Sequence, residues 1–414
     1  MTTHSGILEL TNRGDGRLRT LKTGYEASPS DPVVPAKLVD RFGLRPGALI
    51  EAELGKPGSA GGSNQQQQGG GGKGRNGKRS KSKKRKKSQA NAISADAARV
   101  EKIVSVEGHD PAKYAETPFF DDLTTIDPQP RLTLEHPDAP PVCRLMDLFC
   151  PVGYGQRGMI VSPPKAGKTT ILQNIANGIE KNHPDVEVVA LLVDERPEEV
   201  TDFRRNVPSA VWASSNDHPP ERHVQLCMLA MHRFKRLAEQ GKDVAVLMDS
   251  LTRVGRAFNT APGQQGTGRT LSGGLDAGAL AIPKQLFGAA RKFEEGGSLT
   301  IIATALVETG SRGDQVIFEE FKGTGNMEMI LDRKIAEHRV FPAIDLAASG
   351  TRKEHLLLSE QELATMNALR RRLINMQPVQ QVQQLLKALE RFKTNAELVG
   401  SPQSPGSTQA TARV

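Results

Sequence analysis

The 414-residue chain has few cysteines, no long apolar run and no acidic residue in its most basic segment. Its three cysteines, Cys143, Cys150 and Cys227, form no Cys-x-x-Cys pair and no even set. This pattern favours a reducing compartment over secretion, and we interpret the three as small buried hydrophobic residues. The N-terminus lacks a basic patch followed by an apolar core, and no apolar stretch approaches the roughly 20 residues that span a bilayer. The absences predict a cytoplasmic protein without a membrane partner.

The positive charge of the chain is confined to one segment. Residues 56–95 contain eleven Lys and Arg and no Asp or Glu, so removing them from the net charge of +8 leaves −3 for the rest. The segment is rich in Gly, Ser, Gln and Lys and has almost no apolar side chain to bury, which predicts disorder when it is alone. Two interpretations stay open: a solvated spacer, or an arm that binds a polyanion.

A small β-barrel is predicted on both sides of this segment. The runs "GILEL", "ALIEAEL" and "RVEKIVSVEG", together with the stretch around Leu18, are short β-like segments separated by Gly, Pro and Asp turns. We therefore expect a barrel over residues 1–107, in which 56–95 is an overgrown loop. Residues 108–141 are rich in Pro, Asp and Thr and are expected to form a connector.

From Gly158 onward the pattern is typical of an α/β domain with a buried, mostly parallel sheet. Continuous apolar runs, "GMIV", "VEVVALLV", "DVAVLM" and "SLTIIATAL", alternate with helical patterns. We expect this domain over 142–395 and a disordered tail over 396–414. Before the tail, Ser359 and Glu362 fit a capping box that opens a C-terminal helix.

A phosphate-binding loop is predicted between the first of these runs and the helix that follows. The stretch "SPPKAGKT" ends in Gly-Lys-Thr, and the apolar stripe of the next helix begins near Thr169. Backbone N–H groups and a helix N-terminus bind phosphate in that setting, with Lys168 reaching the β and γ phosphates of ATP and Thr169 helping to hold Mg²⁺. Ser162 stands where such a loop usually begins with glycine.

Acidic residues end the next two predicted strands. Asp194 and Glu195 follow "LLV", and Asp249 follows "VLM", so all three lie at the ligand-binding edge of the sheet. Glu195 is suited to activate a water molecule against the γ-phosphate, and Asp249 to hold Mg²⁺ through water. For Asp194 and Glu195 the alternative is that they cap the helix that starts near Pro197.

Several long stretches together resemble the family of bacterial transcription termination factors called Rho. They include "PPKAGKTTILQNIA", "KDVAVLMDSLTR", "FEEFKGTGNMEM" and "RKIAEHRVFPAIDLAASGTRKEHLL", and the resemblance runs in order from about residue 117 to 375. It implies a RecA-type P-loop ATPase domain after an OB-like, cold-shock-type barrel. It further implies a homohexameric ring that uses ATP and Mg²⁺ to pull single-stranded RNA and to release transcripts from RNA polymerase.

The resemblance also implies roles for individual residues. Arg352 matches an arginine finger that reaches the neighbouring subunit's γ-phosphate, Arg339 is a second candidate, and Phe341 matches an adenine-stacking aromatic. Further contacts with ATP are implied for Pro164, Lys165, Ala166, Gly167, Thr170 and Arg196. In the phosphate-binding loops of this family a small residue, here Ser162, replaces the first glycine. Pro163 and Pro164 restrict the backbone of the loop instead.

RNA contacts are expected in four places. The stretch "TAPGQQGTGRTLSGG" matches a pore loop, with Gly268, Arg269 and Thr270 at its contact positions, and "TGSRGD" presents Arg312 in a second loop. Lys322 and, in the basic segment, Lys84 and Arg85 complete the expected RNA-binding residues. The barrel departs from the family, because "GDGRLR" has Asp15 and Arg17 where stacking aromatics are expected, and Val33 replaces another.

Two other functions stay open from the sequence. One is a different RecA-type motor, such as a DNA recombinase or a rotary synthase subunit. The other is an RNA-binding scaffold whose ATPase is only regulatory.

Overall fold

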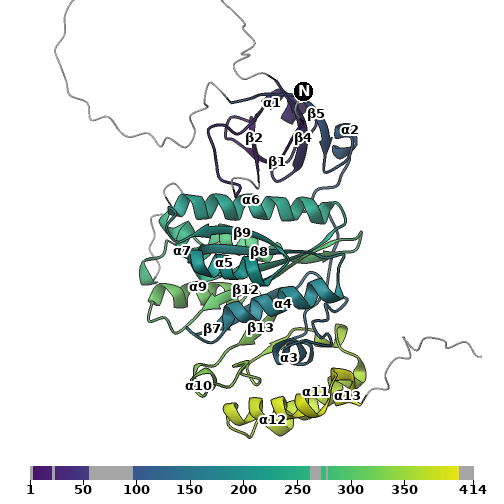
Figure 1. Cartoon of the computed structure of the whole chain (residues 1–414), viewed down its shortest axis with the longest axis vertical. Coiled ribbons are helices and arrows are strands. Elements are labelled where there is room, and N and C mark those ends of the chain that lie inside the picture. Colours follow the sequence, from purple (N-terminus) through teal and green to yellow (C-terminus); the bar gives the residue numbers. More distant parts are fainter. Residues whose placement is uncertain (1–2, 21–23, 56–96, 262–271, 277, 401–414) are drawn as a thin grey trace, which may run out of the picture. The chain divides into compact units, whose positions relative to one another are not determined.

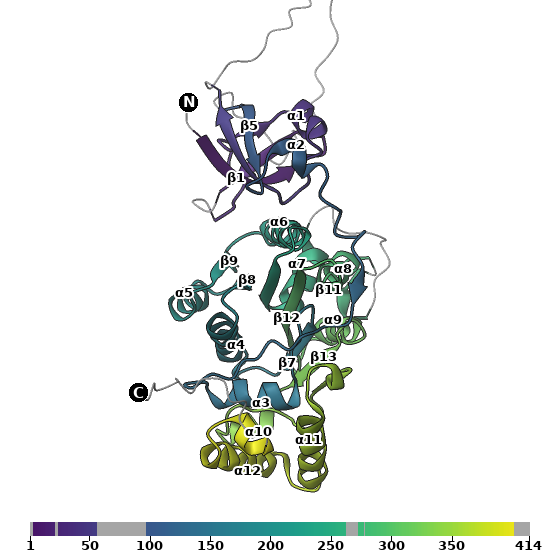
Figure 2. The same ribbon diagram turned by 90° about the vertical axis from the view of Figure 1, so that its right-hand side faces the viewer.

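The chain folds into two compact units, Met1–Glu116 and Thr117–Val414. Figures 1 and 2 show the computed structural model from two directions. The structure describes residues 3–20, 24–55, 97–261, 272–276 and 278–400. The division between the units falls inside the segment expected to be a connector.

The first unit is a five-stranded antiparallel sheet in the order β3-β2-β1-β4-β5. Its elements are β1 (Thr3–Leu10), β2 (Gly16–Arg19), β3 (Val33–Val34), α1 (Ala36–Arg41), β4 (Leu49–Leu54), β5 (Val100–Val106) and α2 (Pro111–Tyr114). Alternate side chains such as Leu8, Leu18 and Ile50 fill one core. The Val33 N–H donates to the Ala98 carbonyl, and Val33 bridges Arg99 in parallel, so β3 meets the chain entering β5. The predicted barrel is confirmed.

The basic segment connects two neighbouring strands of this barrel. β4 pairs with β5, and the Gly55 N–H donates to the Arg99 carbonyl over 2.9 Å. The insert therefore leaves and re-enters the barrel at one edge, as a loop of the barrel. Its residues, Lys84 and Arg85 among them, lie outside the described part of the chain.

The barrel positions that lack aromatics make polar or buried contacts instead. The Thr11 hydroxyl donates to the Asp15 carboxylate, and Arg17 Nη1 donates to the Asp31 carbonyl over 3.2 Å. Val33 is buried in the barrel. None of the three offers an aromatic ring on which a base could stack.

The second unit is built on a mostly parallel sheet in the order β14-β13-β7-β12-β10-β8-β9. Its strands are β7 (Arg157–Ser162), β8 (Glu187–Glu195), β9 (Ala210–Ser215), β10 (Asp243–Asp249), β12 (Ser298–Leu306), β13 (Met327–Ile330) and β14 (Gly350–Thr351), with β6 (Thr125–Ile126) and β11 (Arg291–Phe293) off this path. β13 and β14 pair antiparallel, and the other pairs in the order are parallel. The four apolar runs of the sequence form β7, β8, β10 and β12, as predicted.

Helices cover both faces of this sheet, with α4 and α5 on one side and α7, α8 and α9 on the other (Figure 2). The helices are α3 (Pro141–Phe149), α4 (Lys168–Asn182), α5 (Pro197–Asn206), α6 (Pro220–Glu239), α7 (Leu251–Thr260), α8 (Ala281–Gly288), α9 (Arg312–Lys322), α10 (Arg333–Glu337), α11 (Glu360–Leu373), α12 (Pro378–Arg391) and α13 (Asn395–Val399). A sheet buried on both faces explains why its strands read as continuous apolar runs.

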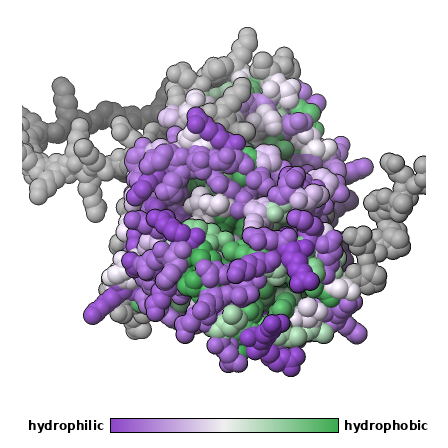
Figure 3. Space-filling model, turned by 60° about the horizontal axis from the view of Figure 1, so that its bottom comes forward, coloured by the Kyte–Doolittle hydropathy of each residue, from purple (hydrophilic) through white to green (hydrophobic). Residues whose placement is uncertain are grey.

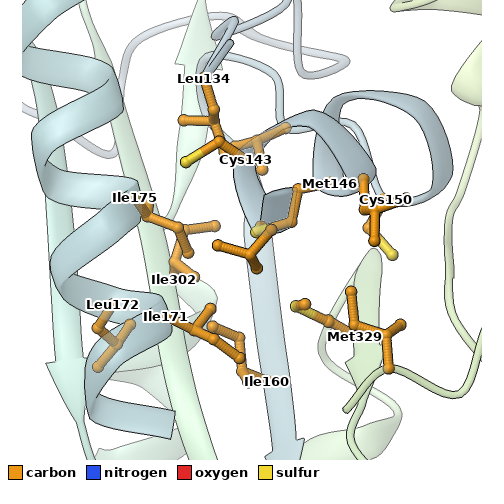
Figure 4. Close-up of a cluster of buried hydrophobic side chains, with 14 of the residues drawn as sticks. Leu134, Cys143, Met146, Cys150, Ile160, Ile171, Leu172, Ile175, Ile302 and Met329 are labelled. Atoms are coloured by element: carbon orange, nitrogen blue, oxygen red, sulfur yellow. The ribbon is translucent and has the colours of Figure 1, made fainter. Parts of the chain in front are cut away.

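The main core lies between α4, α3 and the sheet (Figure 4). Ile171 and Ile175 of α4 point toward Ile160 and Ile302 of the central strands, which confirms the predicted stripe. The three cysteines are free and buried, as predicted. Burial raises the pKa of each thiol to about 12, so all three stay protonated at neutral pH.

The second unit extends beyond the predicted boundaries at both ends. Leu132 and Leu134, in the expected connector, are fully buried, and β6 pairs with β11. Thr394 caps α13, whose Val399 is buried, so residues 396–399 are not a disordered tail. Segments this short bury only a few apolar side chains, so their sequence has no periodic pattern that would predict a helix or a strand. The capping box of Ser359 and Glu362 at α11 is confirmed.

The surface around the C-terminal helices is hydrophilic with hydrophobic side chains gathered in its middle and lower part (Figure 3). Ile374, directly after α11, is largely exposed. Within the described ranges, no helix combines the length and the apolar character needed to cross a membrane.

Candidate active site

The carboxyl ends of the parallel strands bring Lys168, Glu195 and Asp249 to one edge. The loop 163–167 joins β7 to α4. In the sheet, β12 lies between β7 and β10, and β8 lies on the other side of β10. Ser162 is the last residue of β7 and is buried with strand geometry, so a glycine is not required there. The left-handed backbone of the loop occurs at Lys165, with φ of 67°, and at Gly167, with φ of 90°.

Lys168 lies between the two predicted acidic residues. Its Nζ is 2.5 Å from Asp249 Oδ2 and 3.3 Å from Glu195 Oε1. Burial by itself would lower the pKa of Lys168, but the carboxylates of Asp249 and Glu195 outweigh it and raise that pKa. Thr169 Oγ1 is 3.5 Å from Asp249 Oδ2. The structure therefore brings Glu195 and Asp249, from the ends of two other strands, to Lys168 and Thr169.

The oxygen donors of this group fit magnesium. Mg²⁺ is usually held by one or two carboxylates together with phosphate oxygens and water, and the Thr169 hydroxyl and Asp249 carboxylate supply such donors beside the loop. Across the described ranges, no group of three or more His, Cys, Asp or Glu side chains is arranged to hold a metal by itself. A site completed by the phosphates of a nucleotide is consistent with both observations.

Glu195 is 1% exposed, and burial, followed by the charge of Asp249, raises its pKa to about 7. The alternative that Asp194 or Glu195 caps α5 is wrong, because the N-cap residue is Arg196 and the helix has no side-chain cap. α5 begins at Pro197, as predicted. A buried carboxylate that titrates near neutral pH is suited to accept a proton from water.

This pKa predicts how turnover depends on pH. Only the ionised form of Glu195 can accept a proton, so kcat/KM for ATP should fall as the pH decreases through about 7 and level off above it. The pH profile of kcat/KM, which reports the groups of the free enzyme, checks this. In a Glu195→Gln variant the residual turnover should lack that acidic limb, and an unchanged limb would assign it to another group.

Two residues of the site were not predicted from the sequence. Arg253 Nη2 donates to Glu195 Oε2 over 3.2 Å, and the Thr304 hydroxyl donates to Asp249 Oδ1 over 2.6 Å. Arg253 follows Asp249 by four residues, which places it in the first turn of α7, and Thr304 is a polar residue in an apolar strand. Both residues could be noticed in the sequence. Assigning them to the site, however, requires knowing which strands are neighbours in the sheet.

A cavity of about 410 Å³ opens beside the loop. Its lining consists of Pro140, Pro141, Val142, Lys165, Ala166, Gly167, Thr170, Ile171, Asn174, Phe341 and Pro342. Phe341 is 44% exposed although it is a large aromatic residue, so part of its side chain is open to a ligand in this cavity. Pro164 is exposed within the loop, and Arg196 is exposed at the start of α5.

The two candidate arginine fingers are not among the residues that line this cavity. Arg339 is exposed after α10, two residues before Phe341. Arg352 lines a separate cavity of about 950 Å³ that contains no residue of the phosphate loop. Its backbone N–H donates to the Asn326 carbonyl over 2.8 Å, and the next residue, Lys353, pairs with Asp127. In one chain, Arg352 and the loop therefore serve different cavities.

The expected RNA contacts are only partly described. Gly268, Arg269 and Thr270 lie outside the described residues. The end of that loop reaches the second loop, because the backbone at Gly273 packs against Arg312 and Gly313. Arg256 of α7 binds Asp314 through both carboxylate oxygens, over 2.7 and 2.5 Å, and fixes the second loop.

Lys322 does not lie with these loops. It ends α9, about 15 Å along the helix from Arg312, and lines the cavity of Arg352. The structure thus groups Lys322 with the candidate arginine finger.

Both units match models of known families. Residues 4–87 match the RNA-binding domain of the Rho termination factor, and residues 143–351 match the nucleotide-binding domain of the ATP synthase alpha/beta family. Among solved structures, an ATPase from the type III secretion system of pathogenic bacteria is 26% identical, with a TM-score of 0.53. The match covers 62% of this chain and 71% of that one.

Curated relatives match nearly the whole chain. Transcription termination factor Rho of Rhodopirellula baltica is 42% identical over 96% of this chain and 71% of its own length. The factor of Streptomyces coelicolor is 45% identical over 95% and 84%, and that of Mycobacterium bovis 46% identical over 97% and 62%. This chain thus spans less than two thirds of the Mycobacterium relative.

The agreement covers the RNA-binding barrel, the phosphate loop and the sheet edge that carries the site. The matches extend over both units, and several relatives are covered over more than two thirds of their length. The chain therefore belongs to the Rho family of transcription termination factors.

Proposed function

We propose that this protein hydrolyses ATP to move along single-stranded RNA and thereby releases nascent transcripts from RNA polymerase in the cytoplasm. The observation that carries the proposal is that one chain joins a Rho-type RNA-binding domain to a P-loop site in which Lys168, Glu195 and Asp249 converge. The relatives named as termination factors support the same function.

The residues of the site divide the work of hydrolysis. The N-terminus of α4 and Lys168 bind the phosphates, and Phe341 offers a surface for the adenine ring. Glu195 takes a proton from the attacking water, while Arg253 holds its carboxylate. Thr169 and Asp249 would hold Mg²⁺, which when bound neutralises charge that develops on the phosphates.

The position of Arg352 supports a ring of identical subunits. Its cavity contains no residue of the phosphate loop, so Arg352 would act on ATP bound by a neighbouring subunit. An arginine supplied in this way stabilises charge in the transition state of phosphoryl transfer. We propose a homohexamer, as the resemblance to the Rho family implies.

Mixing two inactive chains tests this arrangement. Arg352→Ala chains combined with Lys168→Ala chains should recover some ATPase activity, because certain junctions would pair an intact loop with an intact arginine. The measurement is ATP turnover across mixing ratios, with each variant alone as the control. If mixed rings are shown to form and yet recover no activity, Arg352 acts on the ATP of its own subunit or has a structural role.

The barrel supports a mode of RNA capture that depends on charge. Without aromatics at Asp15, Arg17 and Val33, the barrel lacks stacking worth about 1–3 kcal/mol per base. The basic insert begins and ends at one edge of the same barrel, where it can reach a bound strand. We therefore favour the polyanion-binding arm, which includes Lys84 and Arg85, over the spacer.

Deletion of residues 56–95 tests this choice. If all eight basic residues from Lys78 to Lys87 neutralised phosphates, the log-log salt slope of RNA affinity would be about −6. The deletion should flatten that slope and weaken binding equally for pyrimidine-rich and mixed RNA, measured by titration at several salt concentrations. An unchanged slope would favour the spacer, and a retained pyrimidine preference would show that the barrel still reads bases.

One comparison tests the proposed function itself. ATP turnover is measured with RNA, with DNA and with neither, and only RNA should stimulate it. Stimulation by DNA would favour another RecA-type motor. Turnover that no nucleic acid changes would favour a scaffold with a regulatory ATPase.

A further inference from the structure

The backbone is irregular directly before the candidate base. The pairing of β8 with β9 shifts register between Val193 and Glu195, which leaves Asp194 as the extra residue. Asp194 has a φ of 57°, a left-handed conformation that is uncommon for a residue other than glycine. A bulge of this kind redirects the side chain beside it, here Glu195, and it persists only where its surroundings hold it.

Arg253 binds Asp194, and His223 lies in contact distance of it. Arg253 of α7 donates to the Asp194 carbonyl through Nη1, and that Nη1 lies 3.6 Å from Asp194 Oδ2. His223 of α6 approaches from another direction, with Nε2 at 3.8 Å from Asp194 Oδ1. Arg253 also contacts Glu195, whereas no contact of His223 with Glu195 is found among the described residues.

Ser214 of β9 fixes the orientation of His223. The Ser214 hydroxyl and His223 Nδ1 are 2.8 Å apart, and both side chains are buried. When the hydroxyl donates to Nδ1, the ring carries its proton on Nε2, where it faces the Asp194 carboxylate. Burial lowers the pKa of His223, although Asp194 opposes this, and the nearby His218, Arg222 and Arg253 lower it further, so the ring is neutral at neutral pH.

Ser214, His223 and Asp194 are the residue types of a hydrolase triad, but they are arranged differently. Ser214 has no exposed surface and meets Nδ1, whereas a nucleophilic serine meets Nε2 and faces a substrate. The three side chains instead join β9, α6 and the end of β8. Their common end point is the bulge that precedes Glu195.

We propose that His223 is a positioning residue for ATP hydrolysis, which acts with Ser214 through Asp194 to hold the bulge that aims Glu195 at the attacking water. The inference rests on the proposed function, because it takes Glu195 as the base. A displacement of about 1 Å at a catalytic group can cost about a hundredfold in rate, so a neutral side chain 3.8 Å from Asp194 can control turnover without touching ATP.

A pair of conservative variants separates the two contacts of His223. In His223→Gln the amide nitrogen takes the place of Nε2 and keeps a donor toward Asp194. In His223→Asn the amide takes the place of Nδ1 and keeps only the contact with Ser214. We expect His223→Asn to lower kcat about tenfold with the KM for ATP within about twofold, and His223→Gln to stay within about threefold of the wild type.

A double-mutant cycle tests the route through Asp194. Asparagine tolerates the left-handed backbone, so Asp194→Asn removes the charge without forcing the bulge to change. If His223 acts through Asp194, the Asp194→Asn/His223→Asn chain should be no slower than about the slower single variant. Effects that multiply would overturn the proposal. The proposal would also be overturned if both His223 variants lost kcat equally and had lowered unfolding midpoints, because a general loss of stability would then explain the result.

The wild-type chain and Glu195→Gln are measured beside these variants. A wild type that RNA does not stimulate would contradict the proposed function, and the cycle can still be read in turnover without RNA. Normal turnover in Glu195→Gln would overturn the inference as well, because no base would be left to position.

Discussion

Replacing Lys168 by alanine should abolish ATP hydrolysis and leave the chain folded. The variant lacks the ammonium group that lies 2.5 Å from Asp249 and 3.3 Å from Glu195 at the start of α4, where the β and γ phosphates would bind. ATP turnover should fall to background, and nucleotide affinity should fall with it. Steady-state turnover and nucleotide titration measure both effects.

The variant should fold although two buried carboxylates lose a cation. Glu195 already has a pKa of about 7, and the loss of Lys168 raises it further, so Glu195 becomes protonated and repulsion from Asp249 is relieved. Thermal unfolding checks this. Lys181→Ala is the matched control, because Lys181 lies exposed near the other end of α4 and should behave as wild type. Normal turnover in Lys168→Ala would refute the assignment of the loop.

Replacing Glu195 by glutamine should preserve ATP binding and lower turnover by about 10² to 10⁴. The amide fills the same volume and can still contact Arg253, but it cannot accept a proton from water. Single-turnover hydrolysis with prebound ATP isolates this step from binding. The result should be a lower rate of chemistry at nearly unchanged affinity.

Glu198→Gln is the control for this variant. Glu198 lies exposed in the first turn of α5, three residues from Glu195, so it changes the same charge without touching the buried group. If Glu195→Gln weakened binding while the rate of hydrolysis stayed normal, the carboxylate would have a binding role instead.

Much of the site could be predicted because its residues stand at the ends of apolar runs. β7, β10 and β8 end at Ser162, Asp249 and Glu195, and the carboxyl ends of parallel strands meet at one edge. The capping box at α11 is likewise a local pattern, readable over four residues. Features that are determined by a few consecutive residues can therefore be predicted from the sequence.

Features that depend on contacts between elements far apart in the sequence could not be predicted. Arg253, Thr304 and His223 reach the site only because α7, β12 and α6 pack beside β8 and β10. Val399 and Leu134 are buried by contacts with distant elements, which extended the second unit beyond its predicted limits. The sequence groups Lys322 with the RNA contacts, but the length of α9 places it at the cavity that Arg352 lines.

Release of a nascent transcript is the measurement that tests the central claim most directly. Stalled elongation complexes of purified RNA polymerase are incubated with the wild-type chain, with Lys168→Ala and with Lys181→Ala, in the presence and absence of ATP. The wild type and Lys181→Ala should free the transcript only with ATP, and Lys168→Ala should leave it bound. Release that needs no ATP, or that persists in Lys168→Ala, would contradict an ATP-driven RNA motor.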